Sequence, residues 1–102
     1  MAQEELQKQA GSMVRPEPKE PRKFRVIVLN DDFTTFEFVI EIMITVFGKT
    51  RNEAEIIAET THIHNKATVG KYSLDIARSK VAKATSIARE EGYPLKFEIQ
   101  PE

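Results

Sequence analysis

Hydrophobic and polar residues alternate along this chain in a pattern that predicts six secondary-structure elements. Apolar residues run through 24–29, a length typical of a strand. They recur at helical spacing over three further stretches, 36–47, 54–61 and 76–88. Two other stretches, 66–72 and 95–100, have strand character, the second with strict alternation. The order β-α-α-β-α-β predicts an α+β fold: a single small domain in which a three-stranded antiparallel sheet has three helices packed on one side.

Capping residues mark where the helices begin and end. Thr34 is followed three positions later by Glu37, the spacing of a capping box in which each side chain satisfies a free backbone N–H. We therefore expect the first helix to begin at Thr34. Thr50 and Glu53 repeat this spacing and open the second helix. That helix should end near Asn65, because Asn tolerates the left-handed conformation that often follows a helix.

The second strand and the third helix follow in sequence. Alternation along 66–72 predicts one face made of Ala67, Val69 and Lys71 and another made of Thr68, Gly70 and Tyr72. Ser73 is a good N-cap for the helix that follows. The apolar side of that helix is predicted to contain Ile76, Ala77, Val81, Ala84 and Ala88.

Composition excludes several classes of protein. At 102 residues the chain is long enough for one core, which we place at 23–102. Residues 1–22 are rich in Gln, Glu, Lys and Pro and are expected to form a disordered N-terminal arm. With 15 basic and 16 acidic residues there is no basic field to attract nucleic acid. Because cysteine, a signal peptide and an apolar run of membrane-spanning length are all absent, we expect a soluble cytoplasmic protein.

The polar turn between the first strand and the first helix is the main candidate for chemistry. Asn30, Asp31 and Asp32 bring amide and carboxylate oxygens to this corner, where they either only build the turn or form a small polar site. If His62 from the end of the second helix lies close to them, the group offers several hydrogen-bond acceptors. A peptide α-amino group suits such acceptors, because its pKa near ~8 keeps it a charged donor of three hydrogen bonds.

An apolar stripe lies next to these polar residues in the predicted fold. It is formed by Phe36, Val39, Ala58, Thr61 and Leu95. Stripes of this kind at helical spacing are usually plain core. The alternative is a hole that receives one apolar side chain beside the polar site.

Two other classes of function remain open. His62 and His64, with Asp31 and Asp32, would form a zinc site and hence a small metal-dependent hydrolase, although histidines at i and i+2 of a helix point to different sides. A ribosome-associated structural domain of similar α+β build is the second class. Hydroxyl groups lie mostly at helix caps and the 4 glycines are scattered, so neither nucleophilic catalysis nor phosphate binding by a glycine-rich loop is indicated.

Several segments, taken together, form a more specific pattern. They are Val26-Ile27-Val28-Leu29-Asn30-Asp31-Asp32-Phe33-Thr34, Phe36-Glu37-Phe38-Val39-Ile40 and His62-x-x-x-Lys66-Ala67, with Gly70, Ala77, Lys80-Val81, Ala88-Arg89 and Pro94-Leu95. From about Arg22 to the C-terminus the sequence resembles the bacterial ClpS adaptor family. The resemblance implies an adaptor that binds N-degrons, proteins whose first residue is large and hydrophobic, and delivers them to a Clp AAA+ ATPase and its peptidase. It implies no catalysis, cofactor or metal.

Carried over by position, the resemblance assigns roles around the polar turn. Asn30, Asp32 and His62 match the contacts to the α-amino group of the substrate, and Asp31 lies alongside them. The pocket for the first side chain is matched by Val28, Leu29, Thr34, Phe36, Val39, Ala58, Thr61 and Leu95.

The resemblance also covers the surface away from the pocket. Asp75 and Lys80 on the third helix match the surface that docks on the N-terminal domain of an ATPase of the ClpA or ClpC type. The arm over 1–22 matches an N-terminal extension that takes part in handing over substrate. We expect the adaptor to be a monomer.

Three pocket positions depart from the family pattern. Phe36 stands where Met is common, Ala58 replaces a bulky apolar residue, and Thr61 replaces an apolar one. A flat ring at the rim and a smaller wall residue change the shape of the pocket. We therefore expect an altered preference among Leu, Phe, Tyr and Trp as the first residue.

Overall fold

The computed structural model describes residues 22–102, and the expected N-terminal arm lies outside the described residues except for its last position. The elements are β1 (Phe24–Leu29), α2 (Phe36–Thr45), α3 (Arg51–His64), β2 (Lys66–Tyr72), α4 (Leu74–Glu90) and β3 (Lys96–Pro101). This order confirms the predicted β-α-α-β-α-β arrangement. The bounds of β1 and β2 agree with the predicted ranges 24–29 and 66–72.

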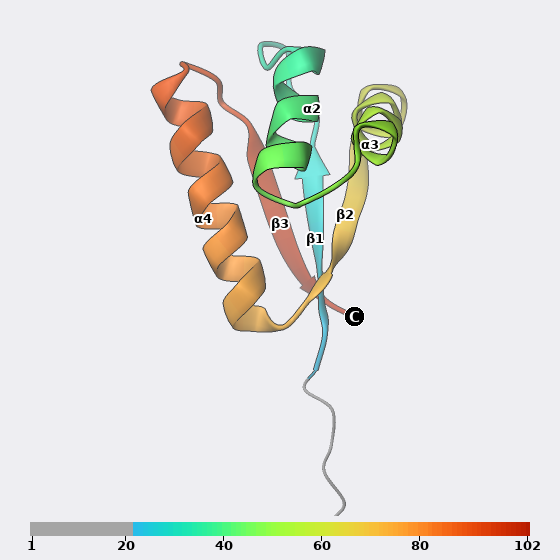
Figure 1. Cartoon of the computed structure of the whole chain (residues 1–102), viewed down its shortest axis with the longest axis vertical. Helices are drawn as coiled ribbons and strands as arrows, with labels where there is room; N and C mark the ends of the chain where they lie inside the picture. Colours follow the sequence, from blue (N-terminus) through green and yellow to red (C-terminus); the bar gives the residue numbers. More distant parts are fainter. Residues whose placement is uncertain (1–21) are drawn as a thin grey trace, which may run out of the picture.

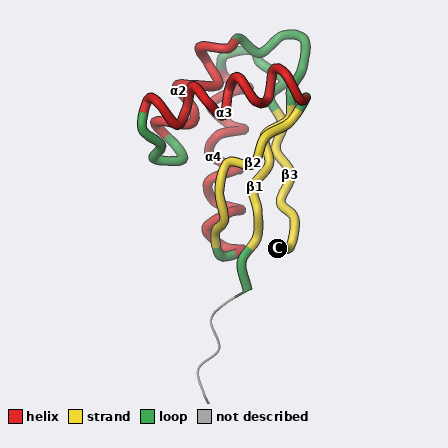
Figure 2. The backbone as a smooth tube through the Cα atoms, turned by 90° about the vertical axis from the view of Figure 1, so that its right-hand side faces the viewer, coloured by secondary structure: helices red, strands yellow, loops and turns green. Residues whose placement is uncertain are grey.

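The sheet has the order β2-β1-β3, and both pairs of neighbouring strands are antiparallel. Figure 1 shows β1 in the middle, and Figure 2 shows the helices gathered on one side of the sheet. Between sheet and helices lies one core, whose largest fully buried side chains are Ile40, Ile42, Met43, Leu95, Val26 and Val28. In the described part of the chain no helix covers the opposite face, which carries alternate residues of β1: Arg25, Ile27 and Leu29.

A bulge in β2 changes which side chains of this strand face the core. Val26 pairs with Gly70 but Ile27 pairs with Thr68, so Val69 is an extra residue without a partner on β1. The two faces predicted for 66–72 are therefore wrong beyond this point. Tyr72 packs against the core, and a Cβ on Gly70 would lie 2.9 Å from its hydroxyl oxygen.

Lys71 correspondingly points away from the core rather than sharing a face with Ala67 and Val69. Its ammonium group forms an ion pair with Glu102 (2.7 Å) on the exposed side of the sheet. A register shift of one residue reverses the two faces of a strand, because successive side chains point in opposite directions.

The first helix begins one residue later than predicted. Its N-cap is Thr35, whose side chain accepts a hydrogen bond from the Phe38 N–H (3.1 Å). Thr34 is instead bonded to Asp31 in the preceding turn, so the predicted capping box of Thr34 and Glu37 is wrong. Two adjacent threonines both suit a cap, and the competing bond from the turn decides between them.

The second helix has the predicted ends. Thr50 and Glu53 form the expected capping box, with bonds of 2.9 and 3.1 Å. Asn65 follows the helix with φ of 72°, the left-handed conformation that was expected. In α4, Ser73 is the N-cap residue, but Ile76 is exposed rather than part of the apolar side. None of the helices in residues 22–102 has the length and hydrophobicity needed to cross a membrane.

Candidate functional site

One carboxylate organises the turn after β1. Asp31 Oδ1 accepts hydrogen bonds from the backbone N–H groups of Phe33 (2.8 Å) and Thr34 (2.7 Å), and Oδ2 accepts one from the Thr34 hydroxyl (2.7 Å). At the start of the turn, the Asn30 N–H donates to the carbonyl oxygen of Asn65 (2.8 Å). This bond ties the turn to the end of α3, so the turn has a defined position relative to that helix.

The electrostatics of the turn favour an ionised Asp31. Partial burial raises the pKa of its carboxyl, but the hydrogen bonds from Thr34 and Phe33, helped by the charge of Arg89, outweigh burial and hold the pKa below its ordinary value. An ionised carboxylate has about four acceptor sites, and the turn uses three of them. One acceptor site of this negative group remains for a ligand.

A cavity of about 340 Å³ lies on the helix side of the turn. All four predicted α-amino contacts line it: Asn30, Asp31, Asp32 and His62. Five of the eight predicted pocket residues line it as well: Thr34, Phe36, Val39, Ala58 and Thr61. The cavity therefore has a polar side, formed by the turn and the last part of α3, and a side formed mainly by α2 and α3.

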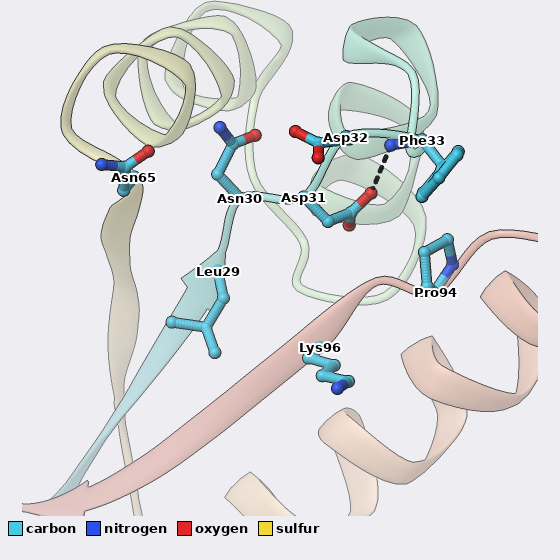
Figure 3. Close-up of a pocket in the computed structure, with 8 residues that line it drawn as sticks. All are labelled: Leu29, Asn30, Asp31, Asp32, Phe33, Asn65, Pro94 and Lys96. Carbon is cyan, nitrogen blue, oxygen red and sulfur yellow. Dashed lines mark hydrogen bonds between the residues drawn. The ribbon is translucent and has the colours of Figure 1, made fainter.

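The other three predicted pocket residues lie elsewhere. Val28 and Leu95 are 0% and 1% exposed and pack in the same core cluster as Val39 and Ala58. Leu29 lines a second cavity that opens on the other side of the turn (Figure 3). The structure thus brings together the residues of the turn, α2 and α3, but not those of β1 and the loop before β3.

The wall of the first cavity combines one exposed ring with small buried side chains. Phe36 is 45% exposed at the start of α2, although its spacing counted it with the core. Ala58 and Thr61 are both 3% exposed, and the Thr61 hydroxyl donates to the carbonyl oxygen of Ile57 (2.7 Å). Because that donor is already used, Thr61 can only accept a hydrogen bond from a ligand.

Three polar side chains of the cavity have no hydrogen-bond partner in the described part of the chain. Within residues 22–102, the side chains of Asn30, Asp32 and His62 make no hydrogen bond or ion pair, and Asn30, Asp32 and His62 are exposed. The fold of residues 22–102 does not use these groups, so in this part of the chain they are available to a ligand. An amide oxygen, a carboxylate and an imidazole nitrogen beside an apolar wall suit a cationic donor that carries an apolar group.

Comparison with known proteins identifies the family. A family model described as ATP-dependent Clp protease adaptor protein ClpS matches residues 19–98. The chain belongs to the ClpS family. It is therefore a member of a family of Clp protease adaptors, which are not enzymes.

Curated ClpS relatives match most of the chain. The ATP-dependent Clp protease adapter protein ClpS of Acetivibrio thermocellus is 48% identical over 84 residues, 82% of this chain and 85% of the relative. The ClpS protein of Desulforapulum autotrophicum is 39% identical over 97 residues, 95% of this chain and 93% of the relative. A solved structure of Agrobacterium tumefaciens ClpS2 bound to L-phenylalaninamide is also similar, with a TM-score of 0.78 and 35% identity over 81% of this chain and 100% of that chain.

The residues required for a metal-dependent hydrolase do not meet in this ClpS fold. His62 and His64 both lie in α3 and line different cavities. Among residues 22–102, no group of three His, Cys, Asp or Glu side chains has the arrangement of a metal site. Because the chain belongs to the ClpS family, its fold is interpreted as that of a Clp protease adaptor and not as a ribosome-associated structural domain.

The two residues matched to the ATPase-docking surface of ClpS differ in their surroundings. Asp75 is exposed in the first turn of α4. Lys80 is half-buried, and its Nζ donates to the carbonyl oxygen of Val46 (3.1 Å), just beyond α2. Its ammonium also lies 5.8 Å from the centre of the Tyr72 ring. Lys80 therefore has a structural contact that the sequence did not indicate.

Sequence reasoning missed the second cavity, which includes Phe33, Asn65, Pro94 and Lys96. Phe33 is the residue with a signal in the sequence, because an aromatic side chain is unusual in a turn built of Asn and Asp. In the structure Phe33 is 74% exposed. The other three residues come from separate segments, and no local pattern connects them.

Proposed function

We propose that this ClpS-family adaptor recognises N-degrons: proteins with a free α-amino group and a large hydrophobic first residue. One observation carries the proposal. The side chains of Asn30, Asp32 and His62, which have no hydrogen-bond partner in residues 22–102, line the same cavity as the apolar side chains of Phe36 and Val39. A ligand that fits both sides must join a cationic hydrogen-bond donor directly to an apolar group, as the first residue of a protein does.

The polar side has the composition needed for an ammonium group. A protonated α-amino group has three N–H donors, which would be taken by Asn30, Asp32 and His62. Asp31 adds a negative charge and one spare acceptor site close by. Hydrogen bonds to a charged group are worth roughly 1.5–3 kcal/mol each, because the charge must otherwise give up its water without replacement. Loss of the ammonium charge should therefore remove most of the binding.

The apolar side supports a single large side chain as the guest. The cavity of about 340 Å³ is large enough for an aliphatic or aromatic group, and Ala58 leaves room that a bulkier residue would fill. The Agrobacterium tumefaciens relative was solved with L-phenylalaninamide. That molecule has a free α-amino group and a benzyl side chain, the two features that this cavity would receive.

The decisive experiment compares free and blocked N-termini. Fluorescent peptides beginning with Leu, Phe, Tyr, Trp and Ala are titrated with the full chain, each with a free and with an acetylated α-amino group. We expect binding of the free peptides that begin with large hydrophobic residues. Acetylation should weaken binding at least about 100-fold, since two or more charged hydrogen bonds are lost. Equal affinity for free and acetylated peptides would show that the cavity does not recognise an N-terminus.

We further propose that Asp75 and Lys80 dock the adaptor on the N-terminal domain of a Clp ATPase of the ClpA or ClpC type. The adaptor would act as a monomer with a core over 23–102, and the arm over 1–22 would help to hand over substrate. Because its protease is ATP-dependent, the cytoplasm is the compartment in which it would work.

The docking surface is tested by one substitution and a control. Asp75→Arg should abolish binding to the ATPase and preserve peptide binding. Glu90→Arg, at the other end of α4, should change neither ATPase binding nor peptide binding. Retained ATPase binding by Asp75→Arg would contradict this docking surface.

A further inference from the structure

A second cavity lies next to the candidate site. Its volume is about 460 Å³, and it lies where β1 ends and β3 begins (Figure 3). The cavity is lined by Leu29, Asn30, Asp31, Asp32, Phe33, Asn65, Pro94 and Lys96. Nothing in the proposed binding of the α-amino group and first side chain uses this space.

The two cavities share one wall. Asn30, Asp31 and Asp32 line both of them. Apart from this shared turn, the cavity of the candidate site is formed by α2, the residues before it and α3. The second cavity is formed mainly by Leu29, Pro94 and Lys96 at the sheet. A ligand bound at the turn by its α-amino group therefore has a cavity on either side of it.

The second cavity has an apolar lining with amides at its edge. Leu29, Phe33 and Pro94 supply carbon surface, and Phe33 is 74% exposed. Among residues 22–102, the Phe33 ring is not part of the core cluster, and the hydrogen bond that this residue makes in the turn comes from its backbone N–H. Asn30 and Asn65 line the edge of this cavity, and side-chain amides can donate to and accept from a peptide backbone (Figure 3).

We propose that this cavity is a second subsite, which binds an apolar side chain at the second residue of the N-degron. The proposal rests on the proposed function. In an extended peptide, successive side chains point to opposite sides. A peptide whose α-amino group lies at the shared turn, with its first side chain among α2 and α3, directs its second side chain toward Leu29, Phe33 and Pro94. The adaptor then reads two consecutive residues rather than one.

The test uses peptides that differ only at the second position. Two peptides begin with a free Phe and continue with Leu or Ala, and a third is the acetylated form of the Phe-Ala peptide. The measured quantity is the ratio of the dissociation constants of the Phe-Ala and Phe-Leu peptides. We expect a ratio of about 5 to 10 for the full chain, because burial of one methylene group changes an affinity about 4-fold and burial of two about 15-fold.

The variant Phe33→Ser tests whether the second side chain of the peptide binds in this cavity. Serine keeps the backbone N–H that bonds Asp31, so the turn is retained, and the ratio should fall to about 1. Ile63→Ser is the matched control, because Ile63 is 60% exposed on α3 and lines neither cavity, and it should leave the ratio unchanged.

The outcomes separate this proposal from the proposed function. If the free Phe-Ala peptide binds and the acetylated one does not, the N-terminus is recognised. In that case, a ratio of the Phe-Ala to the Phe-Leu dissociation constant of 1 for the unmodified chain overturns the subsite alone. The subsite is also overturned if this ratio is above 1 but is unchanged in Phe33→Ser. If the free and acetylated peptides bind equally, both proposals are overturned.

Discussion

Asp31 and Thr34 are joined by two hydrogen bonds, one to the backbone N–H and one to the hydroxyl, both 2.7 Å long. The neighbouring Asp32 makes no such bond in residues 22–102. The two adjacent aspartates therefore differ: Asp31 builds the turn, whereas Asp32 lines the candidate cavity without a hydrogen-bond partner in that part of the chain.

This difference predicts that replacing each aspartate by alanine affects a different property, stability for Asp31 and peptide binding for Asp32. Asp31→Ala should lower the free energy of unfolding by roughly 1–3 kcal/mol, because the turn loses three bonds to a charged acceptor. Asp32→Ala should change it by less than about 0.5 kcal/mol and weaken peptide binding at least about 10-fold. Urea unfolding and peptide titration measure the two quantities. Equal destabilisation by both substitutions would argue against the division of roles.

Stability should fall in acid partly through Asp31. The pKa of this carboxyl is lower in the folded protein than its ordinary value of 3.8, so folding favours the ionised form. Its contribution is complete above the unfolded pKa and is lost as the pH falls through the folded pKa.

Asp31→Asn should therefore be less stable than the unmodified chain at neutral pH, and the difference should shrink as the pH falls below about 4. Glu53 and Glu102, whose pKa values are also lowered by their hydrogen bonds, contribute equally to both proteins. Urea unfolding from pH 7 to pH 2.5 measures the difference. A difference that stays constant across this range would contradict the role of the ionised carboxylate.

The two histidines should behave differently although they are two residues apart. His62 lines the candidate site and His64 lines another cavity near β2. His62→Ala should weaken binding of a free Leu-starting peptide about 10-fold, the loss of one hydrogen bond to a charged group. His64→Ala should leave the affinity unchanged. A similar loss in both variants would show that the α3 terminus, rather than the imidazole of His62, is required.

Filling the pocket should change which first residue is accepted. Ala58 is 3% exposed and lines the cavity, so Ala58→Met places a long side chain where the first side chain would lie. Binding of peptides that begin with Trp or Phe should weaken about 10-fold or more, and that of Leu-starting peptides less. The exposed Ala82→Met on α4 is the control. Unchanged selectivity in Ala58→Met would place the first side chain outside this cavity.

Lys80 should contribute to stability as well as to any docking. Its ammonium bonds the Val46 carbonyl at the end of α2, where a positive charge is favourable. Lys80→Met should lower the free energy of unfolding by about 1 kcal/mol, whereas Lys83→Met, at an exposed position of the same helix, should have little effect. Thermal unfolding measures both. An unchanged stability of Lys80→Met would contradict a structural role for the contact with Val46.

Local chemistry was sufficient to predict most of the elements. The bounds of β1 follow from an apolar run and those of β2 from an alternating pattern, and the ends of α3 follow from Thr50, Glu53 and Asn65. These signals act between residues a few positions apart, so they are present in the sequence itself. The start of α2 was misplaced by one residue because Thr34 and Thr35 suit the cap equally and Asp31 takes the first of them.

The sequence by itself determined the order of elements, the polar turn and the resemblance to the ClpS family. The tertiary structure decided which of these residues meet. Pairing with β1 created the bulge at Val69 and turned Tyr72 inward, and the bond from Asn30 to Asn65 set the turn against α3. Packing likewise buried Val28 and Leu95, exposed Phe33 and placed Asn30, Asp32 and His62 on one cavity. Contacts of this kind depend on register and packing between distant segments, which no local spacing encodes.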